Sequence, residues 1–523
     1  MAAELEQAFA AGMAAVEAQD FAAAEQCFRA IVAARPENHH AWNALAWTYL
    51  WSGQPEIGIE YARRANELDR HNTEYLNTLG VAQGELGDFS GAEATFRKVL
   101  KTKPAYVGGL INLAKVLLKQ GRLDETVKAY ERAYALAPTL PKLASALAQV
   151  YRKAGRAAQA RALLDKAMRS RDAEDLAMAA AETDVELDGP PRGIERLRAA
   201  LERHPEWRLA RLSLSHLCLA SAQWREGWRH YQMRRAERDP ATYALEPLPE
   251  RLDGKRVLLR SEQGIGDVLF FLRFASELRA RGARITLACE AKLVKLLEPA
   301  GEPLEAVREP QADDAAPAGF DYAMRCGDLP ALLETEALPA AWPFAVDAAA
   351  AARARERLAA FGPPPYLAVT WRAGTDVLRQ QEFGNDSRSL MKEVPPAALG
   401  AALRGWRGTA LALQRKLVPA DLAAFVGALG APAHDLSGLG DDLRELLAVL
   451  SQLDEYVSVS NTNDHLLAGL GCTARVLVPY PPEWRWMRPA GPSPWFPGFA
   501  VYREPRSRGW DAPLSALRKD LSL

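Results

Sequence analysis

The order of hydrophobic, small and polar residues divides the chain into two halves. In the first half, apolar residues recur at helical spacing, and glycines stand between consecutive helical segments. Gly53, Gly87, Gly121 and Gly155 lie on a lattice of 34 residues. Glycine adopts the left-handed backbone that ends a helix at lower cost than other residues do. The pattern therefore predicts a row of paired helices joined by short turns.

Prolines follow the same lattice. Pro36, Pro104 and Pro138 fall on it, and Arg70 takes the one remaining place. This period resembles that of the tetratricopeptide repeat (TPR) family, whose units are about 34 residues long. We predict an α-solenoid over residues 1–241, a TPR superhelix of about seven units in which the last two are degenerate.

In the predicted first helix of several repeat units, one position is polar. Asn43, Asn77 and Asn112 recur near it, and Trp47 lies about one helical turn beyond the first of them. The resemblance to superhelical TPR proteins implies that such asparagines hold the backbone of a bound peptide. We therefore predict a protein partner in the groove, bound by Asn43, Trp47, Asn77 and Asn112. The alternative is a solvated surface.

The pattern changes after residue 241. A proline-containing segment, 242–254, is typical of a linker. Beyond it, short apolar runs at 255–260 and 283–288 flank a helical pattern at 268–281. A strand, a helix and a second strand in this order predict a βαβ unit and a parallel sheet.

A second α/β segment begins at three consecutive prolines, 363–365. Its predicted strands are 366–371, 409–414, 455–460 and 474–478, and its predicted helices are 419–429, 442–453 and 466–470. The pattern thus predicts two α/β halves, 255–362 and 363–523, whose loops at strand ends face a cleft.

The first predicted strand leads into a glycine-rich loop, 261–267. The loop lacks the GK[ST] ending of a Walker A motif, and a leucine replaces the third glycine of GxGxxG. Gly264 and Gly266 still allow close approach to the backbone, and the following helix start favours an anion. Asp267 either caps that helix or acts as a general base at the carboxyl end of the strand.

Composition excludes several classes of protein. The 65 basic and 66 acidic residues give a net charge of −1, which excludes nucleic acid bound by bulk electrostatics. Five cysteines are scattered without a CxxC pair, so we expect no zinc site and a reducing, cytoplasmic compartment. We expect no membrane span and no signal peptide, since no apolar run is long enough and the N-terminus lacks a basic region. The motifs HExxH and GxSxG are absent, so a metalloprotease or a serine hydrolase has no support.

Three segments of the second half carry a more specific resemblance. They are EQGIGDVLFFLRFASELRARGARITL (262–287), SNTNDHLLAGLG (460–471) and VLVPYPPEWRWMRPAGPSPWFPGFAVYR (476–503). They resemble the ADP-heptose:lipopolysaccharide heptosyltransferases of glycosyltransferase family 9, and more closely the bacterial TPR proteins that carry such a module. The resemblance implies a GT-B fold of two Rossmann-like domains, with a nucleotide sugar in the cleft and no metal or other cofactor.

The resemblance also implies roles for single residues. It makes Asp267 the general base and places Thr462 and His465 at the donor diphosphate. Asn461 departs from the family pattern, because many relatives have aspartate there. The donor-binding residues that we predict are Gly264, Gly266, Arg372, Arg388, Lys416, Asn461, Thr462, Asn463 and His465. For Trp484 and Trp486, packing is the favoured role.

These observations lead to a functional prediction with two alternatives. We predict a glycosyltransferase that moves a sugar from a nucleotide sugar to a protein recruited by the TPR array. One alternative is a non-catalytic TPR adaptor with a degenerate GT-B module. Asn461 favours this adaptor, whereas Asp267 and His465 oppose it. The other alternative is a transferase whose acceptor is a glycan.

Overall fold

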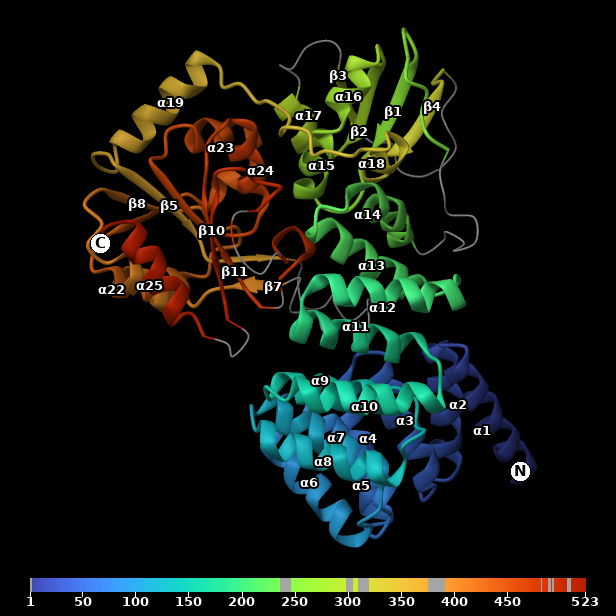
Figure 1. Ribbon diagram of the computed structural model, residues 1–523. Coiled ribbons are helices and arrows are strands. Elements are labelled where there is room, and N and C mark those ends of the chain that lie inside the picture. The colour runs from blue at the N-terminus through green and yellow to red at the C-terminus, as the bar shows by residue number, and fades with distance from the viewer. Residues whose placement is uncertain are drawn as a thin grey trace. The chain divides into compact units, whose positions relative to one another are not determined.

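A computed structural model describes residues 2–235, 246–297, 304–308, 319–374, 391–480, 482–487, 491, 493–505 and 509–523. The chain forms two compact units, residues 1–196 and 197–523. Helices alone build the first unit, and two parallel sheets with their helices make up most of the second (Figure 1). Among the described residues, no helix has the length and apolar character needed to cross a bilayer.

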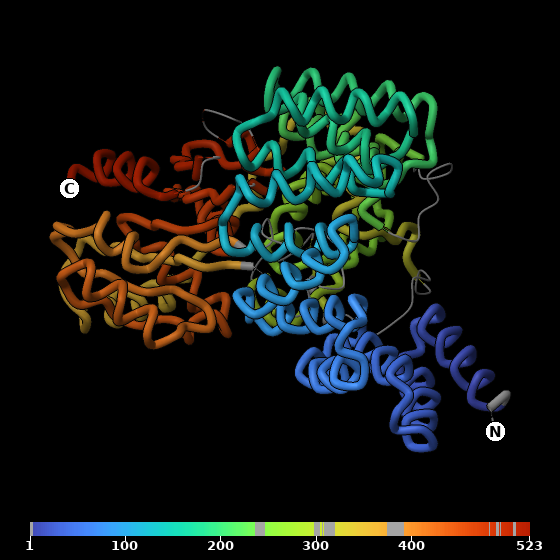
Figure 2. The backbone as a smooth tube through the Cα atoms, turned by 90° about the horizontal axis from the view of Figure 1, so that it is seen from below, coloured from blue at the N-terminus to red at the C-terminus, as the bar shows by residue number. Residues whose placement is uncertain are grey.

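The first unit is a row of helical pairs, as Figure 2 shows from a second direction. Its helices are α1 (Ala2–Glu17), α2 (Phe21–Ala34), α3 (His39–Trp51), α4 (Pro55–Leu68), α5 (Thr73–Glu85), α6 (Phe89–Thr102), α7 (Val107–Lys119), α8 (Leu123–Leu136), α9 (Leu143–Lys153), α10 (Ala157–Ser170), α11 (Glu174–Asp188) and α12 (Pro190–Arg203), whose last residues belong to the second unit. The four lattice glycines have φ between 72° and 79°, the left-handed geometry that the pattern predicts. The predicted helical solenoid is confirmed over α1 to α12, which is shorter than the predicted residues 1–241.

Small residues let the paired helices approach closely. A Cβ atom added at Gly80 of α5 would lie 2.7 Å from the ring of Phe96 in α6. Short polar side chains start several helices: Asp20 accepts a hydrogen bond from the backbone of Ala23, and Asp88 accepts one from Gly91. The sequence thus fixes where the helices begin, where they turn and which faces meet.

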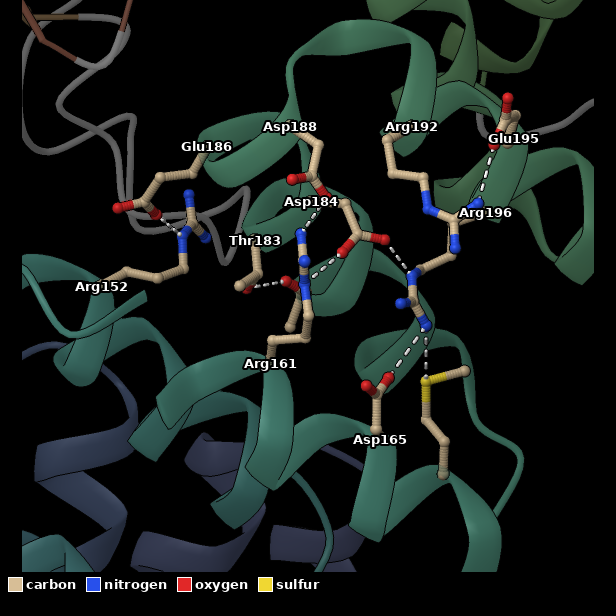
Figure 3. Close-up of polar contacts among 12 residues, drawn as sticks. Arg152, Arg161, Asp165, Thr183, Asp184, Glu186, Asp188, Arg192, Glu195 and Arg196 are labelled. Atoms are coloured by element: carbon tan, nitrogen blue, oxygen red, sulfur yellow. Dashed lines mark hydrogen bonds and ion pairs between the residues drawn. The ribbon is translucent and has the colours of Figure 1, made fainter. Parts of the chain in front are cut away.

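A buried carboxylate joins the last helices of the first unit. Asp184 of α11 is almost fully buried between Arg161 of α10 and Arg196 of α12 (Figure 3). Its Oδ1 lies 2.9 Å from the Nε of Arg161, and Arg196 also pairs with Asp165 at 3.3 Å. Ion pairs therefore supplement apolar packing in the repeat units that depart most from the lattice.

The second unit begins with two further helices, α13 (Arg208–Ala220) and α14 (Trp224–Tyr231), and the short η1 (Gln232–Arg234). Trp228 of α14 is buried against the rings of Phe271, Trp484 and Trp495, which belong to the α/β part. The last helical pair is thus part of the core of the second unit. The described part of the segment predicted as a linker also packs here, because Leu252 is buried.

Four parallel strands form the first sheet, in the order β3-β2-β1-β4. They are β1 (Arg256–Arg260), β2 (Arg284–Cys289), β3 (Leu304–Arg308) and β4 (Tyr322–Arg325), with α15 (Ile265–Leu272), α16 (Ala275–Ala280), α17 (Ala291–Leu297), η3 (Cys326–Asp328) and α18 (Leu329–Leu332). The single helix predicted at 268–281 is two helices. The break follows α15 at Arg273, whose buried guanidinium donates to the carbonyl groups of Phe270 and Trp495.

Six parallel strands form the second sheet, in the order β12-β11-β10-β5-β8-β9. They are β5 (Tyr366–Thr370), β8 (Thr409–Ala412), β9 (Ala433–Asp435), β10 (Glu455–Val459), β11 (Arg475–Val478) and β12 (Ala500–Arg503). The other elements are α19 (Ala348–Ala359), the antiparallel pair β6 (Arg372–Gly374) and β7 (Met391–Glu393), α21 (Pro396–Leu403), α22 (Pro419–Leu429), η6 (Ser437–Asp441), α23 (Leu443–Leu450), α24 (Thr462–Gly469), η7 (Trp484–Trp486) and α25 (Asp511–Asp520). The predicted strands and helices of this half are confirmed to within a few residues at their ends.

Candidate functional site

Each sheet has a point at which the strand order changes direction. In the first sheet, β2 and β3 lie on one side of β1 and β4 lies on the other. In the second, β8 and β9 lie on one side of β5, and β10 lies on the other. Open parallel sheets bind ligands outside the carboxyl ends of the strands at such a point. The loop 261–267 follows β1 and α24 follows β10, so both predicted loops stand at these points.

Asp267 lies in the first turn of α15, where it caps the helix. Its Oδ2 accepts a hydrogen bond from the backbone N–H of Gly264 at 3.3 Å. Its Oδ1 accepts one from Nη2 of Arg485 at 2.5 Å, and Arg485 belongs to η7 of the other α/β half. The side chain of Asp267 remains 27 % exposed. The carboxylate thus holds its own loop and also bridges the two halves.

Gly266 brings the loop directly against α24. A Cβ atom at this position would lie 3.3 Å from Cδ2 of His465 and 3.6 Å from the hydroxyl oxygen of Thr462. Two residues predicted at the donor diphosphate therefore face the loop that carries Asp267. The structure brings Gly264, Gly266, Asp267, Thr462 and His465 together at one place.

The asparagines of this segment build the start of α24. Asn461 accepts a hydrogen bond from the backbone of Asn463 at 2.7 Å, and Asn463 donates to the hydroxyl of Tyr456. Asp464 accepts from the backbone of Asn461 and from Ser458, and burial raises the pKa of Asp464 to about 7. The amide side chains of Asn461 and Asn463 are thus engaged within the fold itself.

His465 is buried and uncharged. Burial above all, and then the nearby charges of Arg485 and Arg273, lower its pKa well below the usual 6.5. Its ring packs against Phe270 and Phe496, and Nδ1 has no hydrogen-bond partner among the described residues. At neutral pH this imidazole can offer a ligand a hydrogen bond but no positive charge.

Three charged residues at this place were missed from the sequence. Lys392 of β7 forms an ion pair with Glu483, and Glu483 pairs with Arg485 at 2.5 Å. Burial alone would raise the pKa of Glu483, but the charges of Lys392 and Arg485 outweigh it and hold that pKa well below its usual range. For Glu483 and Arg485, the available signal was the presence of charged residues within the aromatic segment 482–487.

Of the remaining predicted donor residues, two lie at the sheet edge from which α24 starts and one lies outside the described part. Arg372 begins β6 after β5, and its guanidinium lies 3.3 Å from the carboxylate of Asp421. Lys416 is exposed and follows β8. Because β5, β8 and β10 are parallel neighbours, both residues share the sheet edge from which α24 starts. Arg388 lies outside the described residues.

The predicted partner-binding residues of the first unit form a partial ladder. Nδ2 of Asn112 in α7 donates to Oδ1 of Asn77 in α5 at 3.0 Å. Oδ1 of Asn43 in α3 is buried and has no hydrogen-bond partner among the described residues. Trp47 stacks on Trp51, which is 52 % exposed. The asparagines of α5 and α7 are thus joined to each other, and Asn77 itself is buried.

Comparison with known proteins identifies the first part of the chain. Two family models of the tetratricopeptide repeat match it, one over residues 9–72 and 77–141 and the other over 117–183. The segment 9–183 carries tetratricopeptide repeats. This finding confirms the TPR prediction for that segment, which lies within the first unit.

Among characterised proteins, the chain is similar to Protein FlbA of Caulobacter vibrioides and to a CTR9 homolog of Arabidopsis thaliana. The first match is 25 % identical and covers 68 % of this chain and 58 % of FlbA. The second is 26 % identical and covers 31 % of this chain and 16 % of the relative. The chain therefore spans less than two thirds of the length of either. An alignment over 68 % of the chain extends beyond the helices that end at residue 234 into the α/β part.

Two solved structures are similar to part of the chain. The Pseudomonas aeruginosa protein PilF is 17 % identical, with 38 % of this chain and 92 % of that chain covered and a TM-score of 0.34. A tetratricopeptide repeat protein of Parabacteroides merdae is 12 % identical, with 44 % and 91 % covered and a TM-score of 0.36.

Proposed function

We propose that the second unit is a glycosyltransferase that moves a sugar from a nucleotide sugar to an acceptor, with its two α/β halves arranged as in the GT-B fold. The observation that carries this proposal is the meeting of two loops from different sheets. Gly266 lies against His465 and Thr462, next to Asp267, and each loop stands where the strand order of its sheet reverses. A ligand at this place contacts both halves.

In the proposed reaction, Asp267 takes the proton of an acceptor hydroxyl while the hydroxyl oxygen attacks the anomeric carbon. The bond from that carbon to the diphosphate breaks, and the diphosphate leaves with the electron pair. The hydroxyl of Thr462 and the ring N–H group of His465 donate hydrogen bonds to it. Because His465 is neutral, its contribution is a directed hydrogen bond rather than a charge.

The tetratricopeptide repeats support a protein as partner or acceptor. The amides of Asn43 and Asn112, and Trp51 with Trp47 stacked on it, are suited to an extended peptide. We assign to the array the recruitment of the acceptor or of a partner that presents it.

Binding of a panel of sugar nucleotides tests this function. Thermal shift or calorimetry is measured on the wild type and on His465→Ala. The proposal predicts that one nucleotide sugar stabilises the wild type and that His465→Ala loses the effect. If no member of the panel binds to the folded wild type, the proposal is wrong.

A non-catalytic adaptor is the second candidate, and one observation favours it. Both carboxylate oxygens of Asp267 are engaged, by Gly264 and by Arg485. An adaptor keeps this bridge closed and acts through its repeats alone. The panel separates the two candidates, because only a transferase binds a donor. A transferase with a glycan acceptor binds a donor but transfers no sugar to protein.

A further inference from the structure

A row of four alternating charges joins the two α/β halves. Asp267 of α15 pairs with Arg485 of η7, Arg485 pairs with Glu483, and Glu483 pairs with Lys392 of β7. The side chain of Arg485 is only 8 % exposed, the lowest value of the four. Removing a charge from water is costly, and a buried pair is often no more stabilising than apolar packing. A contribution to the stability of the fold is therefore a weak explanation for this row of ion pairs.

The guanidinium of Arg485 keeps unused hydrogen-bonding capacity. It has five N–H donors, of which Nη1 serves Glu483 and Nη2 serves Asp267. Its Nε is buried and has no hydrogen-bond partner among the described residues. Aromatic rings fix the plane of the group, which lies 4.6 Å from the ring centre of Phe270 and 4.4 Å from that of Trp484. A rigid, planar cation with open donors is the group best suited to a phosphate.

The position of Arg485 is that of the proposed donor site. Its partner Asp267 follows Gly266, which faces His465 and Thr462 at the start of α24. Its charge is also one of those that lower the pKa of His465. The cation therefore lies beside the helix start at which an anion is favoured.

We propose that Arg485 exchanges partners during the reaction: it holds Asp267 while the site is empty and binds the diphosphate when the donor enters. This inference rests on the proposed function, because the anion is the diphosphate of a nucleotide sugar. Glu483 and Lys392 keep Arg485 in place throughout. The exchange frees the Asp267 carboxylate for the acceptor only once a donor is present, so the donor binds first.

Opposite effects of two substitutions test the exchange. Calorimetry measures the binding of inorganic pyrophosphate to the full chain. Arg485→Gln removes the cation and should weaken binding at least tenfold. Asp267→Asn removes the competing charge and should tighten binding several-fold. The double variant should bind as weakly as Arg485→Gln. Arg475→Gln serves as a matched control, because Arg475 pairs with Glu455 at the other end of β10 and should leave binding unchanged.

Several outcomes overturn the proposal. If Asp267→Asn and Arg485→Gln weaken binding alike, or if neither changes it, the ion pair is only structural. If a nucleotide sugar binds and His465→Ala abolishes binding while Arg485→Gln does not, the donor site stands and the exchange is wrong. If the wild type binds neither pyrophosphate nor any nucleotide sugar, both proposals fall.

A second variant covers the case in which Arg485→Gln does not fold, as judged by near-ultraviolet circular dichroism. Arg485→Lys keeps the charge but loses the planar fork, and it should bind pyrophosphate a few-fold more weakly than the wild type. Unchanged binding in Arg485→Lys together with weaker binding in Asp267→Asn would contradict the exchange.

Discussion

Gly266 decides how closely the two α/β halves can meet, because a side chain there presses on His465 and Thr462. We predict that Gly266→Ala weakens donor binding without unfolding the protein. Gly427 of α22 is the matched control, since a Cβ there meets nothing within 4 Å. Gly427→Ala should raise the free energy of unfolding by about 0.5–1 kcal/mol and leave binding unchanged. If Gly266→Ala and Gly427→Ala bind the donor equally well, the contact of Gly266 with His465 and Thr462 does not control binding. Urea titration and calorimetry supply the two measurements.

His216 makes the stability of the second unit sensitive to acid. Burial, followed by the charge of Arg485, lowers its pKa to about 4. In the unfolded chain the pKa is about 6.5, so below that value the unfolded state binds a proton that the folded state does not. Proton uptake by the unfolded chain lowers the free energy of unfolding. With respect to His216, this free energy is therefore highest above pH 6.5 and falls as the pH drops towards 4. Asp464, with its pKa raised to about 7, works in the opposite sense over much of this range.

The substitution His216→Phe isolates this effect. Between pH 7 and pH 5, the wild type should lose about 1–2 kcal/mol more free energy of unfolding than His216→Phe does. His71→Phe, at an exposed position of the first unit, should follow the wild type. Urea unfolding followed by tryptophan fluorescence reports chiefly on the second unit, where most of the 13 tryptophans lie. Parallel pH profiles of His216→Phe and the wild type would refute the assignment.

At the scale of single residues, sequence patterns locate the loops but miss part of the site. Asp267 and His465 could be named because each follows an apolar strand and starts a helix. Arg485 could not, because its segment has no periodicity and its partner lies 218 residues away. The sequence predicts that the amides of Asn461 and Asn463 bind the donor, whereas in the structure they complete the helix start. A polar side chain at a helix start serves either purpose, and the sequence does not distinguish them.

At the scale of helices and strands, a strict period is the strongest predictor. The glycine lattice predicts the turns of the first unit because their left-handed backbone is costly for other residues. The break between α15 and α16 could not be predicted. At the break, the buried Arg273 donates a hydrogen bond to the carbonyl group of Trp495, which is 222 residues distant. Contacts between residues so far apart in the sequence leave no periodic pattern near either residue.

The ion pairs among α10, α11 and α12 allow a prediction at the same scale. Asp184→Asn leaves Arg161 and Arg196 without their shared buried charge, and it should lower the free energy of unfolding by about 1.5–3 kcal/mol. Asp165→Asn removes a partner of Arg196 that is 42 % exposed, so its cost should stay below about 1 kcal/mol. Urea unfolding followed by circular dichroism measures both. If both variants lose a similar amount of unfolding free energy, the burial of Asp184 does not determine its contribution to stability.

At the scale of the whole molecule, the two units allow recruitment and chemistry to be tested separately. The proposed site belongs entirely to residues 197–523, so removal of residues 1–172 leaves it intact. We predict that this deletion abolishes sugar transfer to protein and spares hydrolysis of the donor. Mass spectrometry of the acceptor and chromatography of the released nucleotide measure the two activities. Equal loss of both would reject recruitment by the repeats.

Transfer by the variant Asp267→Asn tests the central proposal most directly. The amide keeps the size of the side chain but cannot take a proton from the acceptor hydroxyl. The measurement is the rate at which the sugar moves from the nucleotide sugar that binds to the acceptor, with donor binding determined in parallel. We predict that Asp267→Asn lowers the rate at least ~100-fold while the donor still binds. Transfer by Asp267→Asn at the wild-type rate would contradict the account.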